Sequence, residues 1–160
     1  MRVALAVVLA VALPQPSACV LRRPDVGAAF TATGVSTGAH GYQVEFTRRT
    51  GSLQDGPLFV LSSATVYRSV RAAHGAFAAS TRSAPAGYVS LPLGFSIGED
   101  AHQWVRQGAS GVGVLLQYRL LWRERNVDAS IVITGRVGVV SAADVEPLAK
   151  RQETRIRKAL

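Results

Sequence analysis

Three arginines lie close to a tryptophan in the stretch from Gln117 to Ile133. Arg119, Arg123 and Arg125 flank Trp122 there. Planar guanidinium groups bind phosphate and carboxylate groups through paired hydrogen bonds, so these arginines are candidate anion-binding residues. The alternative interpretation is an ordinary hairpin whose turn is charged because it lies in water.

Residues that could support catalysis are present, but they lack catalytic spacing. The three histidines, His40, His74 and His102, are far apart and show no metal-ligand spacing. Ser36 lies in a G-x-S-x-G motif, which needs a strand before it and a helix after it, and residues 39–41 do not start a helix. We therefore expect no enzyme, no metal and no cofactor. A hydrolase is the alternative, and it requires His74 or His102 beside a serine and a carboxylate.

The first residues have the layout of a secretory signal peptide. Arg2 precedes an apolar run from Val3 to Leu13, and small residues follow before Cys19. The run is too short for a transmembrane helix, which needs about 20 residues. We therefore expect residues 1–18 to be a signal peptide and the protein to be extracytoplasmic.

Cys19 is the only cysteine of the chain and directly follows the predicted cleavage point. With Ser17 and Ala18 it resembles the lipid-acceptor cysteine that ends the lipobox of bacterial lipoproteins. This resemblance implies lipid attachment at Cys19 and a membrane as partner, and plain secretion is the alternative. One thiol cannot form a disulfide within the chain.

The chain is strongly basic, with 18 Lys and Arg residues, 10 Asp and Glu residues and a formal net charge of +8. Such a charge attracts anions, including lipid head groups, phosphorylated glycans and nucleic acid. It also keeps a protein soluble without any specific partner, and these basic residues are spread along the chain. Nucleic-acid-binding motifs are absent from the sequence, so nucleic acid is not an expected partner.

Hydrophobic periodicity predicts the regular elements. Residues 19–41 are rich in small side chains, and we expect a tether there with a possible short strand near residues 28–33. Alternation of apolar and polar residues predicts strands over residues 42–47, 58–67 and 88–97. A helical stripe over residues 70–81 follows Ser69, a plausible N-cap. Residues 98–111 are glycine-flanked and are expected to form no more than one turn of helix.

Alternating apolar residues on both sides of a charged turn predict a long hairpin. A register that pairs Trp122 with Val127 keeps the apolar residues on one face, whereas a slip of one residue would expose them. The turn then lies at Glu124 and Arg125, or it is longer and places Asn126 at positive φ.

The last predicted element is a helix that begins near Asp144. Its inward stripe consists of Val145, Leu148, Ala149, Gln152, Ile156 and Ala159. Acidic residues at its start and basic residues at its end match the helix dipole. The basic tail is therefore interpreted as a solvated helix face, with phosphate or membrane binding as the alternative.

The element order does not alternate strands with helices, which argues against a parallel sheet. We predict an α+β fold for residues 42–160, a single domain. It consists of an antiparallel sheet of about five strands with two helices packed on one face.

Three stretches resemble a pattern in uncharacterised exported α+β proteins of actinobacteria: "IGEDA" at residues 97–101, "LLWRERNVDASIVITG" at 120–135, and "DVEPLAKRQETRIRKAL" at 144–160. Arg125 stands where that pattern usually has glycine. In element order the chain is also similar to extracellular sensor domains of actinobacterial kinases and to PsbP-like lipoproteins. The resemblance to sensor domains and PsbP-like lipoproteins implies binding rather than catalysis, and neither resemblance implies catalytic residues.

Together these observations predict a non-enzymatic binding or sensor-type domain of the cell envelope, anchored by lipid at Cys19. A small-molecule, lipid or anionic envelope ligand would bind between sheet and helix, or on the open sheet face that carries Gln117, Arg119, Arg123 and Ser130. The alternative is a structural or interaction protein that binds polyanions through its arginines.

Overall fold

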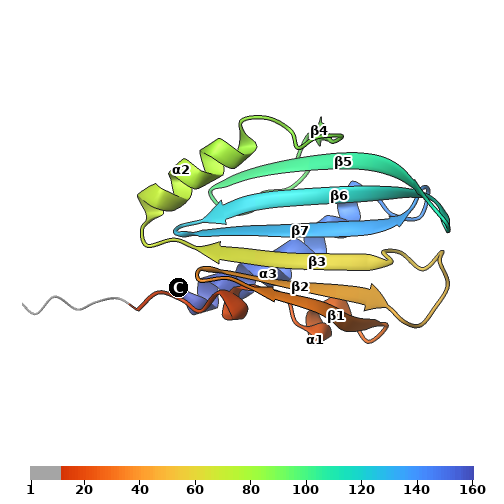
Figure 1. Cartoon of the computed structure of the whole chain (residues 1–160), viewed down its shortest axis with the longest axis horizontal. Coiled ribbons are helices and arrows are strands. Elements are labelled where there is room, and N and C mark those ends of the chain that lie inside the picture. Colours follow the sequence, from red (N-terminus) through yellow and green to blue (C-terminus); the bar gives the residue numbers. More distant parts are fainter. Residues whose placement is uncertain (1–11) are drawn as a thin grey trace, which may run out of the picture.

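The computed structural model describes residues 12–160. In this part of the chain, one antiparallel sheet of seven strands has the order β1-β2-β3-β7-β6-β5-β4 (Figure 1). The strands are β1 (Phe30–Thr37), β2 (Gly41–Arg48), β3 (Phe59–Val66), β4 (Val89–Leu91), β5 (Asp100–Ser110), β6 (Gly113–Glu124) and β7 (Val127–Arg136). The helices are η1 (Pro16–Cys19), α1 (Arg23–Val26), α2 (Val70–Thr81), η2 (Ala142–Asp144) and α3 (Val145–Ala159). The predicted α+β class is confirmed, and the predicted number of about five strands is wrong.

The prediction missed strand β5, which we expected to be at most a helical turn. Polar and apolar residues occur on both faces of β5, so their alternation along the strand is weak. The polar Gln103 shares one face with Ala101. Trp104 shares the other face with His102. Gln103 and Trp104 are nonetheless 3% and 2% exposed. The strand forms because it pairs with β6 along its whole length.

The β6–β7 hairpin is present, but its register differs from the predicted one by two residues. Trp122 pairs with Ala129, and Glu124 pairs with Val127. A shift of two residues keeps every side chain on its predicted face, because side chains alternate with a period of two. The turn consists of Arg125 and Asn126, and Arg125 has a φ of 54°.

The face of the sheet that contacts α3 is called the inner face, and it carries the main core. Trp122 of β6, Ile131 of β7 and Ile156 of α3 are each 0% exposed within one cluster. In the predicted inward stripe of α3, Ala159 is partly buried and packs against the core, and the other members are buried: Val145, Leu148, Ala149, Gln152 and Ile156. Burial of such side chains is the main stabilising term of the fold.

Helix α2 packs on the opposite, outer face. Figure 1 shows α3 behind the sheet and α2 at the upper left, beside the ends of β5 and β6. The Ser69 hydroxyl caps α2 by accepting a hydrogen bond from the Ala72 amide at 3.1 Å. The buried residues of α2 are Ala73 and Phe77, and the Phe77 ring lies 5.9 Å from the His102 ring of β5. The expectation that two helices pack on one face is therefore wrong. Both sheet faces carry apolar residues near β5 and β6, so a helix packs on each face and shields these residues from water.

The segment 19–41, expected as a tether with a short strand, contributes η1, α1 and β1 to the fold. Cys19, Val20 and Leu21 belong to the main core cluster. The Leu21 amide donates a hydrogen bond to the Ser62 hydroxyl of β3 at 2.9 Å. Among residues 12–160, no helix has both the length and the apolar composition to cross a membrane.

Candidate functional site

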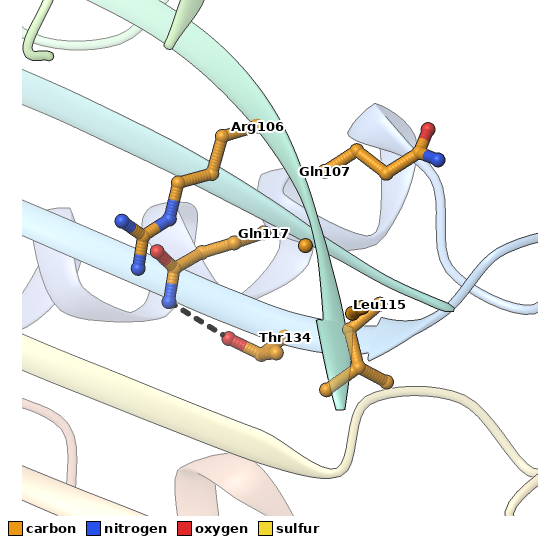
Figure 2. A pocket seen from close by; sticks show the side chains of 7 residues that line it. Arg106, Gln107, Leu115, Gln117 and Thr134 are labelled. Atoms are coloured by element: carbon orange, nitrogen blue, oxygen red, sulfur yellow. Dashed lines mark hydrogen bonds between the residues drawn. The ribbon is translucent and has the colours of Figure 1, made fainter. Parts of the chain in front are cut away.

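A hollow of about 260 Å³ lies on the outer face, over the ends of β5, β6 and β7 (Figure 2). It is lined by Arg106, Gln107, Gly108, Ala109, Leu115, Gln117 and Thr134. Figure 2 shows the side chains of Arg106, Gln117 and Thr134 directed toward one another, whereas Gln107 points away. The hollow therefore joins three polar groups from three neighbouring strands.

Strand register explains why these three residues converge. Gln117 of β6 pairs with Arg106 of β5 on one side and with Thr134 of β7 on the other. Directly opposed residues in an antiparallel sheet project from the same face, with their Cβ atoms about 5 Å apart. One row across the sheet thus carries a guanidinium, a carboxamide and a hydroxyl.

Tyr88, just before β4, adds an aromatic wall beside this row. The Arg106 guanidinium lies 5.0 Å from the centroid of the Tyr88 ring, a cation–π arrangement. The Tyr88 hydroxyl donates a hydrogen bond to Oε1 of Gln117, and Nε2 of Gln117 donates to the Thr134 hydroxyl at 3.0 Å. Gln117 therefore orients both Tyr88 and Thr134.

The arrangement leaves two donors available to a ligand. Arg106 is exposed and makes no ion pair with any residue between 12 and 160. Because the Thr134 hydroxyl accepts from Gln117, its own proton is free to donate into the hollow. A guanidinium and a hydroxyl donor on one face suit a carboxylate or phosphate group.

Of the three predicted anion-binding arginines, Arg119 lies nearest this hollow. It projects from the outer face two residues along β6 from Gln117, opposite Trp104 of β5 and Val132 of β7. Its Nε atom is buried and has no hydrogen-bond partner in the described part of the chain. Arg119 and Arg106 occupy diagonal positions, which places two positive charges on the same part of the face.

Arg123 and Arg125 lie at the other end of β6, so the three arginines do not form one site. Arg123 is 6% exposed, and its guanidinium forms ion pairs with Glu99 and, at 2.7 Å, with Asp100. Arg125 is exposed in the turn. The charge of Arg123 is therefore used within the protein, to hold the start of β5 against the hairpin.

Asp128 pairs with Arg123 across the hairpin and is 8% exposed. Burial raises its pKa from the ordinary 3.8 to about 6, although interactions with Tyr67 and Arg123 act in the opposite direction. Burial and the neighbouring Asp128 carboxylate raise the pKa of Tyr67 to about 12. We therefore expect the Asp128 carboxyl to make the stability of the fold depend on pH, and not to bind a ligand.

The residues considered for catalysis lie apart. The His102 ring packs between Phe77 and the Trp104 ring, 5.7 Å away. Ser36 lies within β1, and the chain then turns into β2 rather than into a helix. Within residues 12–160, no group of three or more His, Cys, Asp or Glu side chains could hold a metal ion.

Cys19, the predicted lipid-attachment residue, is 0% exposed. Burial raises the pKa of its thiol to about 11, so the reactive thiolate is strongly disfavoured at neutral pH. An acyl chain on Cys19 would require this residue to leave the core. Lipid attachment and the packing of Cys19 seen here are therefore alternative states of the N-terminal segment.

The alternation along β6 predicts Gln117 on the open face, but no sequence pattern predicted Arg106, Thr134 and Tyr88 as site residues. Arg106 was missed because β5 was not recognised, and Tyr88 because its contact depends on a loop closing over 29 residues. No protein-family model matches the chain, and no match was found among curated proteins or solved structures.

Proposed function

We propose that the protein is a non-enzymatic binding domain of the cell envelope, whose hollow on the outer face binds a small molecule that carries a carboxylate or phosphate group. The observation that carries this proposal is the Arg106 guanidinium, which makes no ion pair among residues 12–160 and lines the same hollow as the Thr134 hydroxyl that Gln117 orients. Such preorganisation lowers the entropy lost on binding.

A ligand on the open face is favoured over a lipid between sheet and helix. The side chains between α3 and the sheet, including Trp122, Ile131 and Ile156, are fully buried in one cluster. A lipid-like ligand would have to displace them, at a cost of several kcal/mol for each large side chain. The hollow on the outer face needs no such rearrangement.

Export and lipid attachment at Cys19 form a separate part of the proposal, supported by the apolar run from Val3 to Leu13 and the small residues before Cys19. Intact mass of the membrane fraction from the native host tests this part, with wild type compared with Cys19→Ala. A diacylglyceryl mass that disappears in the variant would support lipid attachment. An identical unlipidated species in both would exclude it.

Calorimetric titration tests the ligand site. The probes are inorganic phosphate, glycerol phosphate, succinate and citrate, each titrated into wild type and Arg106→Gln. We expect at least one probe to bind and Arg106→Gln to weaken its binding about tenfold or more, because a charge-assisted hydrogen bond is lost. Arg71→Gln is the matched control, since exposed Arg71 on α2 loses the same charge.

The results distinguish this site from polyanion binding spread over the arginines. Distributed binding survives the loss of any one arginine and falls steeply with salt. Equal effects of Arg106→Gln and Arg71→Gln would therefore contradict the proposed site, and so would the absence of binding by every probe. Thr134→Val provides a second test, because it removes the hydroxyl while it leaves the net charge unchanged.

A further inference from the structure

A second, strongly basic surface lies on α3 and α1, on the inner side of the sheet and away from the proposed ligand site. It contains a hollow of about 260 Å³ lined by Asp25, Arg151, Thr154, Arg155 and Lys158. Arg151 and Lys158 are exposed. They lie seven residues apart along α3, which places them on one side of the helix.

Asp25 is the acidic residue in this hollow, and its charge is already compensated. Its carboxylate forms an ion pair with Arg155 at 2.6 Å and accepts a hydrogen bond from the Arg22 amide at 2.7 Å. Partial burial alone would raise the pKa of Asp25, but these interactions hold the pKa below its ordinary value. Asp25 is therefore ionised at neutral pH and positions Arg155. Arg151 donates one hydrogen bond to the Asp25 carbonyl, and its other N–H groups, like the Lys158 ammonium, can contact an anion.

Next to this hollow lies a second, more apolar hollow, and Arg22 and Arg23 form part of its wall. Its volume is about 370 Å³, and it is lined by Ser17, Val20, Leu21, Arg22, Arg23, Ala32, Val35, Tyr42, Val44 and Phe46. Val35, on the edge strand β1, is 59% exposed. Exposed apolar surface bordered by arginines is typical of proteins that bind at the boundary between lipid head groups and acyl chains.

The course of the chain gives an independent reason to connect this surface with a membrane. Ser17 lines the apolar hollow, so the residues before it join the fold at the rim of this surface. In the sequence, these preceding residues include the apolar run from Val3 to Leu13. While residues 1–18 are attached, the part of the sequence with the highest affinity for lipid is thus connected to the protein beside its basic surface. After cleavage, the proposed lipid on Cys19 joins the chain at the same place, two residues from Ser17.

We propose that this surface, defined by Arg22, Arg23, Arg151, Arg155 and Lys158 together with the apolar hollow, docks on an anionic lipid bilayer. Arg22, Arg23, Arg151 and Lys158 contact head-group phosphates, while Arg155 stays paired with Asp25. The hollow faces the outer ends of the acyl chains. Each basic side chain near an anionic membrane strengthens binding about fivefold. The outer face, with the proposed ligand site, then points away from the membrane.

Co-sedimentation of the full chain with lipid vesicles tests this proposal. Vesicles of phosphatidylcholine alone are compared with vesicles that contain about one third phosphatidylglycerol. The test variant is Arg151→Gln/Lys158→Gln. The control is Arg68→Gln/Arg71→Gln, which removes the same charge from exposed residues at α2, on the opposite face. Thermal unfolding of each variant verifies that the fold is intact.

We expect wild type to bind the anionic vesicles more tightly than the neutral ones. The Arg151→Gln/Lys158→Gln variant should lose about 20-fold in binding to anionic vesicles, and the control less than threefold. Any affinity that comes from the apolar run is common to all proteins compared. Equal losses in both variants would show that binding depends on net charge alone and would overturn the proposal. Equal binding of wild type to both kinds of vesicle would overturn it as well.

A soluble polyanion provides the last comparison. Heparin carries a high negative charge but no acyl chains, and Val35→Ser reduces only the apolar part of the surface. We expect Val35→Ser to weaken binding to anionic vesicles while heparin binding stays unchanged. If heparin binding requires Arg151 and Lys158 but vesicle binding does not, the surface binds polyanions and the membrane assignment is wrong.

Discussion

The Ser62 hydroxyl donates a hydrogen bond to the Gln152 carboxamide oxygen at 2.8 Å, and both residues are 0% exposed. The same hydroxyl accepts from the Leu21 amide at 2.9 Å, and Nε2 of Gln152 donates to the Ser63 carbonyl at 2.8 Å. One buried network therefore joins β3, α3 and the N-terminal segment, and these hydrogen bonds satisfy the polar atoms involved.

Gln152→Met is expected to destabilise the fold by about 2–4 kcal/mol. The substitution keeps the side-chain volume but leaves the buried Ser62 hydroxyl proton without its acceptor and removes the hydrogen bond from Nε2 to the Ser63 carbonyl. Urea denaturation measures the effect, and Thr154→Ala on the exposed side of the same helix should stay within about 0.5 kcal/mol of wild type. In combination with Ser62→Ala, the loss should be less than additive by about 1 kcal/mol. Additive losses would contradict a direct coupling.

Arg125→Gly is expected to stabilise the protein by about 0.5–1 kcal/mol. Arg125 is the non-glycine residue with positive φ in the described chain, and glycine adopts that conformation without steric cost. Asn126→Gly is the matched control in the same turn and should destabilise, because the Asn126 amide donates to the Tyr67 carbonyl at 2.9 Å. Thermal unfolding compares the two variants, and destabilisation by Arg125→Gly would disprove the interpretation.

Asp128→Asn is expected to change how stability depends on pH. The folded pKa of about 6 lies above the ordinary 3.8, so the neutral carboxyl stabilises the folded state below about pH 4. This contribution is lost as the pH rises through 6. The variant should match wild type near pH 4 and exceed its free energy of unfolding by up to about 3 kcal/mol at pH 8.

Urea denaturation at several pH values measures the difference between Asp128→Asn and wild type. Asp100→Asn serves as the control, because Asp100 is exposed and belongs to the Arg123 ion pairs instead. A constant difference between Asp128→Asn and wild type from pH 4 to pH 8 would rule out titration of Asp128 as the cause.

The Cys19 thiol is expected to be unreactive in the folded, unmodified protein. Its full burial and its pKa of about 11 both suppress attack by the thiolate. Labelling with a thiol reagent at pH 7.5 should be at least about 100-fold slower in buffer than in 8 M urea. Rapid labelling of the native protein would show that residues around Cys19 leave the core easily, as lipid attachment requires.

Local patterns determine much of the fold. Ser69 caps α2 through a local hydrogen bond that its hydroxyl accepts from the Ala72 amide. The stripe from Val145 to Ile156 follows from the helical repeat alone. The period of two likewise assigns Leu120 and Trp122 to one face of β6 and Arg119 to the other. These features need only neighbouring residues, so sequence is sufficient for them.

The hairpin register and strand β5 depended on partners outside the local pattern. Two registers of the hairpin keep the same faces, so the alternation of apolar and polar residues does not select between them. In the observed register β7 also pairs with β3, and Arg125 has positive φ in the turn. Strand β5 has a weak alternation, and its pairing with β6 stabilises it. Propensity and pattern cannot decide such cases, because tertiary pairing contributes more than either.

The sequence by itself determined the α+β class, the start of α2, the stripe of α3 and the face to which each residue of β6 belongs. Only the tertiary structure decided that α2 and α3 cover opposite faces, that Arg123 is used in ion pairs, and that Arg106, Gln117 and Thr134 meet. Periodicity states which residues share a face, but not what covers that face. The order of the strands and the long-range packing supply that information.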